Sequence, residues 1–140
     1  MPRSVAELTA VDDPAWPALA AAIAAAPLPV QALPIARAAG EHVLERLQVT
    51  TRSAMGALAL ECGGLLVDHG WLRILCGGAP GLPDLASANG IDAQASSAPG
   101  SLLVAADVLG GRFAVDGGAL GVEPGQVCYF APDTLRWEGL

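Results

Sequence analysis

The sequence predicts an α+β fold, with N-terminal helices packed on a mostly antiparallel sheet of about six strands. Glycine is unevenly distributed, since only Gly40 of the 17 glycines precedes residue 56. Four Gly-Gly pairs then separate short runs of Leu, Val, Ile, Phe and Tyr, which is typical of tight turns between antiparallel strands. The start of the chain is instead rich in alanine, with apolar residues at helical spacing.

A length of 140 residues predicts a single α+β domain over 1–140, with a helical part at 1–47 and a β part at 56–140. This length suffices to bury a core without disulfides or a structural metal. The sequence contains no internal repeat of fixed period, so a repeat architecture is not expected.

The first part of the chain predicts two helices before its prolines. Ser4 and Glu7 have the spacing of a capping box, so a short helix is expected to begin near Val5. Asp13-Pro14 supplies an N-cap residue followed by proline at the first helical position. This second helix should therefore extend to about Ala26.

A third helix is predicted over Ile35–Leu47, because Val43, Leu44 and Leu47 fall on one side of it.

Asp68-His69-Gly70 is predicted to be a turn. The strands that follow the third helix are predicted at Gly56–Leu60, Gly64–Val67, Trp71–Leu75, Leu102–Ala105, Phe113–Val115, Gln126–Phe130 and Leu135–Trp137.

A long loop is predicted between two groups of strands. Pro80–Gly100 is rich in Gly, Pro, Ser and Ala and has little apolar pattern. Within it, one helical turn at Pro83–Ala88 would be closed by Asn89-Gly90.

The charge of the chain excludes several classes of function. A net charge of −7 and a pI of about 4.5 argue against sequence-independent binding of nucleic acid, which needs clustered cations. The chain has no lysine, which excludes a Walker-loop lysine, a Schiff-base lysine and a polybasic membrane patch. The acidity either aids solubility or serves to meet a basic partner.

The sequence predicts a cytoplasmic protein without a membrane span. The uncharged run Pro14–Ala36 contains prolines that would break a spanning helix, and Asp12-Asp13 stands where a secretory leader needs positive charge. Three cysteines without a dense framework are expected to be reduced thiols.

Neither a metal nor a cofactor is expected. Cys62, His69 and Cys76 are evenly spaced, but the strand pattern places His69 at the far end of a hairpin, roughly 15 Å from the cysteines. Zinc needs all its ligands within about 2.3 Å of one ion. Gly117–Gly121 suggests a phosphate loop but precedes no helix, so Asp116 is expected to begin a wide hairpin turn.

Five residues are candidates for binding: Asp68, His69, Trp71, Arg73 and Asp116. Trp71 and Arg73 alternate on a strand and share a face, which is the composition of a binding hot spot. The simpler interpretation is that Trp71 belongs to the core and Arg73 snorkels or pairs with Asp68 or Glu61. Asp68-His69 resembles a base with its orienting carboxylate, yet no nucleophile pattern accompanies it, so no catalytic residue is assigned.

Four blocks of the chain, from Gln48 to Leu60, Gly64 to Leu75, Leu102 to Gly121 and Val127 to Glu138, resemble a bacterial family known as domain of unknown function 2625. This resemblance implies no activity. A weaker likeness, over Phe113–Trp137 and in the order of elements, is to the SUKH superfamily. That likeness implies a sheet flanked by helices, and many such proteins bind and neutralise nuclease-type toxins.

The resemblance also implies helices beyond the last block, whereas this chain ends at Leu140. We therefore expect a short member, a truncation, or a homodimer or partner that covers the exposed sheet. The leading expectation for function is non-enzymatic protein binding, with a basic toxin as a candidate partner. The alternatives are a small hydrolase or isomerase, or a small-ligand module, using a sheet-edge pocket near Asp68, His69 and Asp116.

Overall fold

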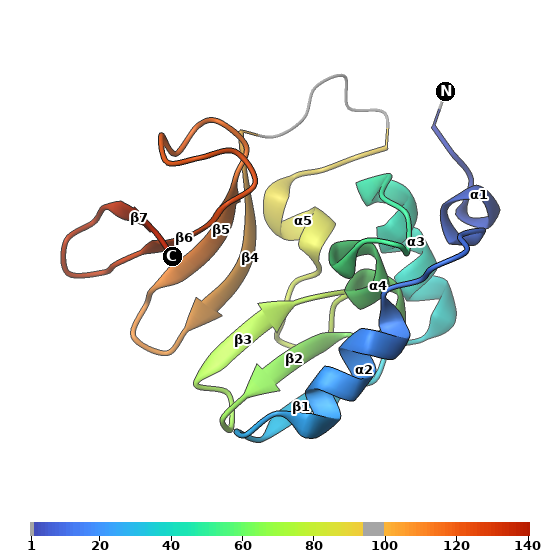
Figure 1. Ribbon diagram of the computed structural model, residues 1–140, viewed down its shortest axis with the longest axis horizontal. Coiled ribbons are helices and arrows are strands. Elements are labelled where there is room, and N and C mark those ends of the chain that lie inside the picture. Colours follow the sequence, from blue (N-terminus) through green and yellow to red (C-terminus); the bar gives the residue numbers. More distant parts are fainter. Residues whose placement is uncertain (1, 94–99) are drawn as a thin grey trace.

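A computed structural model describes residues 2–93 and 100–140 of the chain (Figure 1). Over these residues the chain forms five helices and seven strands. The helices are α1 (Val5–Thr9), α2 (Trp16–Ala25), α3 (Arg37–Leu47), α4 (Ala54–Glu61) and α5 (Leu85–Asn89). The strands are β1 (Val30–Leu33), β2 (Gly64–Val67), β3 (Leu72–Leu75), β4 (Ser101–Asp107), β5 (Arg112–Asp116), β6 (Val127–Phe130) and β7 (Trp137–Gly139).

The strands form one antiparallel meander, because their order in the sheet is their order in the sequence, from β1 to β7. The predicted α+β class is confirmed, with seven strands among the described residues where about six were expected. Turns or loops without a helix join β2 to β3 and the successive strands from β4 to β7, whereas α3 and α4 lie between β1 and β2 and α5 lies between β3 and β4. A register shift between Leu103 and Ala105 introduces a bulge in β4.

The N-terminal helices begin as local chemistry dictates, with one exception. The capping box of α1 is confirmed, since the Ser4 hydroxyl accepts from the Glu7 amide at 3.2 Å and the Glu7 carboxylate accepts from the Ser4 amide at 3.2 Å. The predicted Asp13 cap of α2 is wrong. That helix begins at Trp16 after Ala15, which has no side-chain cap, and Pro17 lies in its first turn.

Two other expectations are corrected. Gly56–Leu60 was expected to be a strand but belongs to α4, because Ser53 caps the helix by accepting from the Gly56 amide at 3.0 Å. Val30–Leu33 was not expected to be a strand but forms β1 at the sheet edge, paired from Val30↔Val67 to Leu33↔Gly64. The helix predicted over Ile35–Leu47 is confirmed as α3, with Val43 and Leu44 buried.

The apolar clusters that involve helices lie beside the first four strands. One cluster joins Val43 of α3, Ala59 of α4 and Leu85 of α5 to Leu75 of β3. A second packs Ile23 of α2 against Leu65 and Ile74. In Figure 1 the helices gather beside β1 to β4, while β5, β6 and β7 extend away from them. The C-terminal strands therefore lie away from the helices, although Ala114 of β5 and Cys128 of β6 are buried.

The loop after β3 contains the expected helical turn. It forms α5, and Gly90 ends it in the left-handed conformation with φ of 63°. The part of the predicted Pro80–Gly100 loop at 94–99 lies outside the described residues. None of the helices in the described ranges is long and apolar enough to cross a bilayer, and the uncharged run Pro14–Ala36 is divided between α2 and β1.

Candidate functional site

The β2–β3 turn presents the candidate residues Asp68 and His69 to solvent. Asp68, His69 and Gly70 take φ values of 51°, 59° and 89°, so three successive left-handed residues reverse the chain. The Asp68 amide donates to the carbonyl of Pro29 at 2.7 Å and thereby ties the turn to the start of β1. This confirms the predicted turn. Asp68 and His69 are both exposed, and both belong to this reversal of the backbone.

Trp71, which follows this turn, is not a core residue. Its side chain is 52% exposed, so the interpretation that placed it in the core is wrong. Exposed apolar residues lie beside it, because Val108 at the β4–β5 turn donates its amide to the Trp71 carbonyl at 3.0 Å. Val108 is 50% exposed and Leu109 is 64% exposed. An exposed Trp among exposed apolar side chains marks an interaction surface more often than a structural one.

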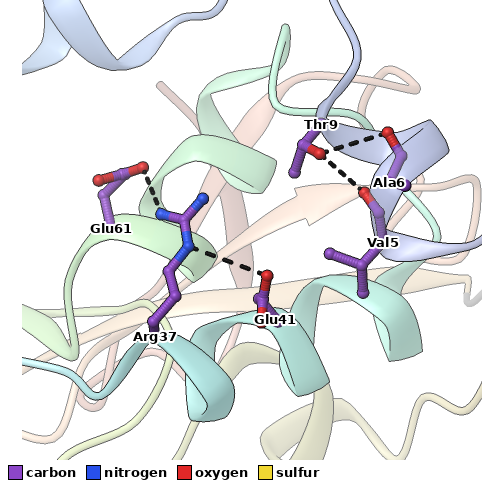
Figure 2. A network of polar contacts seen from close by, with 6 residues as sticks. All are labelled: Val5, Ala6, Thr9, Arg37, Glu41 and Glu61. Carbon is purple, nitrogen blue, oxygen red and sulfur yellow. Dashed lines mark hydrogen bonds and ion pairs between the residues drawn. The ribbon is translucent and has the colours of Figure 1, made fainter.

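Arg73 is also exposed and makes no ion pair with any residue in the described part of the chain. The pairing with Glu61 suggested by the sequence is made by another arginine. Figure 2 shows Arg37 between Glu41 of α3 and Glu61 of α4, with nitrogen–oxygen distances of 3.9 and 3.2 Å. The charge of Arg73 acts on the Asp107 carboxyl, but no described carboxylate lies within 4.0 Å of the Arg73 guanidinium, so the guanidinium can still bind an external partner.

The sheet register aligns Arg73 with further charged and aromatic side chains. Residues directly opposite in an antiparallel sheet point to the same face. Successive pairings give a row that crosses five strands, which we call the arginine–aromatic row: Arg73 (β3), Ala106 (β4), Arg112 (β5), Phe130 (β6) and Trp137 (β7). Its last three residues lie on β5, β6 and β7, which extend away from the helices (Figure 1).

Side-chain contacts order the far half of the row. The Phe130 and Trp137 rings lie 5.2 Å apart in a tilted arrangement, and the Arg112 guanidinium lies 4.7 Å above the Phe130 ring. Arg112 is exposed, and both rings are half-buried. Arg73 and Arg112 flank the small Ala106, and two strand spacings put their Cα atoms about 10 Å apart. The row thus offers two cations and a tilted aromatic pair to one partner.

An apolar groove opens beside Arg73 on this face. Its volume is about 170 Å³, and its walls are Leu75, Leu103, Ala105 and Ala106 of the sheet and Gly81, Leu82 and Pro83 of the loop. Arg73 is the charged residue of its lining. The groove and the row share Arg73 and Ala106, so together they form one continuous surface.

The opposite face carries a hydrogen-bonded aromatic that supports the β4–β5 turn. The Tyr129 hydroxyl donates to Asp107 Oδ2 at 2.9 Å, and its ring lies 4.8 Å from that of Phe113. Burial raises the pKa of the Asp107 carboxyl, but hydrogen bonds from Tyr129, Gly111 and Leu109, together with the charge of Arg73, outweigh burial and lower this pKa overall. The same bond to Asp107, with burial, raises the pKa of Tyr129.

Asp116 does not join Asp68 and His69, so the structure does not form the expected shared pocket. Asp107 pairs with Leu72 next to the β2–β3 turn, and β5 then runs back to place Asp116 opposite Ser101 at the other end of the sheet. There Asp116 is 1% exposed. Its carboxylate accepts from the amides of Gly118, Leu120 and Val122 at 2.7, 3.1 and 2.9 Å. It therefore organises the β5–β6 connection.

The cysteines lie at the helical end of the β2–β3 hairpin, away from His69. Cys62 caps α4 and Cys76 follows β3, and both are buried and free. The hydrogen bond to Cys62, together with burial, raises the pKa of Cys76, which keeps that thiol protonated. No group of three His, Cys, Asp or Glu residues that could hold a metal occurs within residues 2–93 and 100–140.

Sequence reasoning identified Trp71 and Arg73 but missed Arg112, Phe130 and Trp137. Each stands in a run that was predicted as a strand or borders one. Alternation within a single strand says which neighbours share a face, but not which residue of the next strand lies opposite. Hairpin lengths could have supplied that register only if every strand end had been known.

Comparison with known proteins places the chain in a family without an assigned activity. Residues 5–140 match the profile of a family described as "Protein of unknown function DUF2625". The chain is 41% identical over 138 residues to the uncharacterized protein YbfG of Escherichia coli (strain K12), a match covering 99% of the chain and 63% of that protein. It is 34% identical over 142 residues to an uncharacterized protein of Haemophilus influenzae (strain ATCC 51907 / DSM 11121 / KW20 / Rd), covering 99% of the chain and 62% of that protein.

The chain thus spans a little under two thirds of the length of these relatives. No solved structure matches it significantly. The resemblance to the family of unknown function is confirmed, whereas these matches lend no support to the weaker SUKH likeness.

Proposed function

The chain belongs to the family of proteins of unknown function DUF2625, and from that premise and the geometry of the arginine–aromatic row we propose that it is a non-enzymatic protein-binding domain. The row itself is the observation that carries the proposal. In-register pairing brings Arg73, Arg112, Phe130 and Trp137 to one surface, with the exposed Trp71 preceding β3. Trp and Arg are the residue types enriched at binding hot spots.

The energetics of the row favour a protein as partner. Trp71 is 52% exposed and the Phe130 and Trp137 rings are half-buried, so these aromatic side chains still offer contact area to one side of an interface. Arg112 is already held over Phe130, so less side-chain entropy is lost when it binds. Neutralisation of a toxin is one role that such binding would serve.

The sign of the charge on this surface bears on the expected basic partner. The chain as a whole carries −7, which suits a basic protein at long range. The row, however, presents two arginines and no carboxylate of its own. The part of the partner that contacts the row should therefore be acidic, even if the partner as a whole is basic.

An enzymatic function has less support from the geometry. The hydrolase or isomerase alternative needed Asp68, His69 and Asp116 around one pocket, but Asp116 lies at the other end of the sheet and its carboxylate already accepts backbone amides. Among the described residues, those that line the groove beside Arg73 include neither a base nor a nucleophile. A small-ligand function would use this groove and not the sheet-edge pocket.

Affinity capture with matched variants tests the proposal. Immobilised wild-type chain, Arg112→Gln and Trp137→Ser would be incubated with lysate of Escherichia coli strain K12, and bound proteins quantified by mass spectrometry. A specific partner should be retained by the wild type and reduced at least about tenfold by either variant, as the loss of a hot-spot residue implies. Circular dichroism and the unfolding midpoint would verify that the variants fold.

Two further variants make the result decisive. Arg52→Gln removes an arginine on the helical side of the chain and should leave capture unchanged. His69→Gln should also leave it within a few-fold, because an exposed turn residue contributes under about 1 kcal/mol. Equal capture by the wild type and both row variants would contradict the proposal. A loss caused by His69→Gln alone would instead favour the enzyme alternative.

A further inference from the structure

We infer that the occupant of this surface is an acidic segment of a protein that inserts one bulky apolar side chain into the groove and sets carboxylates against Arg73 and Arg112. This inference rests on the proposed function and specifies the chemistry of the partner. Three observations carry it: the size of the groove, the unpaired state of the two arginines, and the small residue between them.

The groove has the volume of one side chain. Sites for drug-sized molecules typically measure about 300–1,000 Å³, whereas this groove measures about 170 Å³. Leu75, Leu82 and Leu103 give it an apolar lining, so a polar or charged group would lose its hydration without gaining hydrogen bonds. Leu, Met or Phe is the side chain that such a groove accepts.

The arginines supply the charge complementarity. Elsewhere in the chain, Arg37 pairs with two glutamates, and Arg46 lies 3.8 Å from Asp84 and donates to Ser87. Arg73 and Arg112 make no such pair with any described residue. A guanidinium binds a carboxylate with two parallel hydrogen bonds, so each arginine can take one acidic side chain.

Ala106 leaves the space between the arginines open. It pairs with Arg73 on one side and with Arg112 on the other, and it also lines the groove. An anchor side chain in the groove and carboxylates on both sides of Ala106 would therefore belong to one short segment. The Cα separation of about 10 Å between the arginines suits acidic residues three apart on a polyproline II segment, in which every third side chain lies on the same side and the rise is about 3.1 Å per residue.

Two other occupants fit the row less well. A symmetric contact between two copies of this face would bring the arginines of one copy against those of the other, and like charges in contact cost affinity. Nucleic acid would meet two cations on a chain whose net charge is −7. An acidic segment of a protein that is basic elsewhere meets neither obstacle, because the basic remainder offsets the long-range repulsion.

Peptide display tests the inference directly. A random twelve-residue peptide library would be selected against the folded chain, and the affinity of the selected peptides measured by fluorescence polarisation. We expect selected sequences to combine one Leu, Met or Phe with two acidic residues. Arg73→Gln and Arg112→Gln should each weaken their binding about tenfold or more, whereas Arg52→Gln should not.

A variant that fills the groove tests the contribution of the apolar anchor independently of the arginine charges. Ala106→Leu places a larger side chain in the groove and between the arginines without changing the charge, so it should weaken the same peptides comparably. Added sodium chloride should weaken binding to the wild type, because it screens exposed ion pairs. This measurement needs no variant and so remains informative if a substitution impairs folding.

The outcomes separate this inference from the proposed function. Selected peptides without acidic residues, or acidic peptides that bind Arg73→Gln and Arg112→Gln as well as the wild type, would overturn the inference. The proposed function would still stand if Trp137→Ser abolished their binding. Peptides insensitive to every row variant, or no selected peptide at all, would overturn both. Displacement of the peptides by a single-stranded oligothymidylate would assign the row to nucleic acid instead.

Discussion

Buried Asp116 is the residue on which the long β5–β6 connection depends. The hydrogen bond from the Gly118 amide lowers the pKa of its carboxyl most strongly; burial opposes this, and amides further along lower the pKa again. We expect Asp116→Asn to lower the urea midpoint of unfolding at neutral pH, because the amide NH₂ group cannot accept these bonds. Asp13→Asn, at an exposed position, should leave the midpoint unchanged.

The pH dependence of Asp116→Asn follows from the lowered pKa. A carboxyl with a folded-state pKa below its unfolded value stabilises the fold fully above that unfolded value, which is about 3.9 for aspartate. The stabilisation is lost as pH falls through the folded-state pKa. The difference in free energy of unfolding between wild type and variant should therefore be largest above about pH 5 and shrink toward about pH 2. A difference that grows on acidification would refute this account.

Tyr129 offers a spectroscopic prediction, because it is the single tyrosine in the sequence. Its hydrogen bond to Asp107 and its burial raise its pKa above the ordinary value. The ultraviolet absorbance of tyrosinate should appear at higher pH in the native protein than in the urea-unfolded protein. Asp107→Asn should shift the native titration toward that of the unfolded chain. Coincident titrations of wild type and Asp107→Asn would show that the bond does not form in solution.

At the scale of elements, α3 and α4 pack closely through a glycine. A Cβ atom added at Gly40 would lie 2.5 Å from the backbone oxygen of Leu60, which cannot move aside as a flexible side chain would. Helix propensity alone predicts that Gly40→Ala stabilises α3 by about 1 kcal/mol. Overpacking costs about 1–3 kcal/mol, so the substitution should be destabilising overall.

Chemical unfolding measures this balance. Ala39 is the exposed neighbour of Gly40 in α3, so Ala39→Gly measures the difference in helix propensity between Ala and Gly alone. This substitution should cost about 1 kcal/mol without any change in packing. Both substitutions should then lower the free energy of unfolding, although their propensities have opposite signs. A stabilising Gly40→Ala would mean that α3 and α4 are further apart than described.

At the scale of the whole molecule, the exposed sheet favours self-association. Val122, Val127 and Leu140, near the C-terminal strands, are large apolar residues that are 39%, 41% and 70% exposed. We predict a homodimer through the face opposite the arginine–aromatic row, where Phe113, Val115 and Val127 share one side of β5 and β6.

Light scattering over a dilution series checks the oligomeric state. Val127, which is 41% exposed, lies on the predicted interface, whereas Leu28, which is 52% exposed, precedes the opposite edge strand. Val127→Asp should shift the dimer toward monomer, and Leu28→Asp should not. A wild-type monomer at every concentration would exclude the dimer.

The sequence by itself determined the features that depend on a few neighbouring residues. The capping box of Ser4 and Glu7, the apolar side of α3, the turn at Asp68-His69-Gly70 and the end of α5 at Gly90 are all formed as predicted. Each is built from hydrogen bonds and backbone conformations within about one helical turn, so the information lies within reach of local pattern.

Only the tertiary structure decided what lies opposite what. The apolar run Gly56–Leu60 suits a strand or a buried helix equally, and its contacts with α3 and the Ser53 cap made it α4. Val30–Leu33 became β1 by pairing with a strand more than 30 residues away. The arginine–aromatic row and the distant position of Asp116 depend on the register of every intervening hairpin. The position of one residue relative to another several strands away depends on the register of each pairing between them. Local sequence could therefore predict the strands but not the surface that they form.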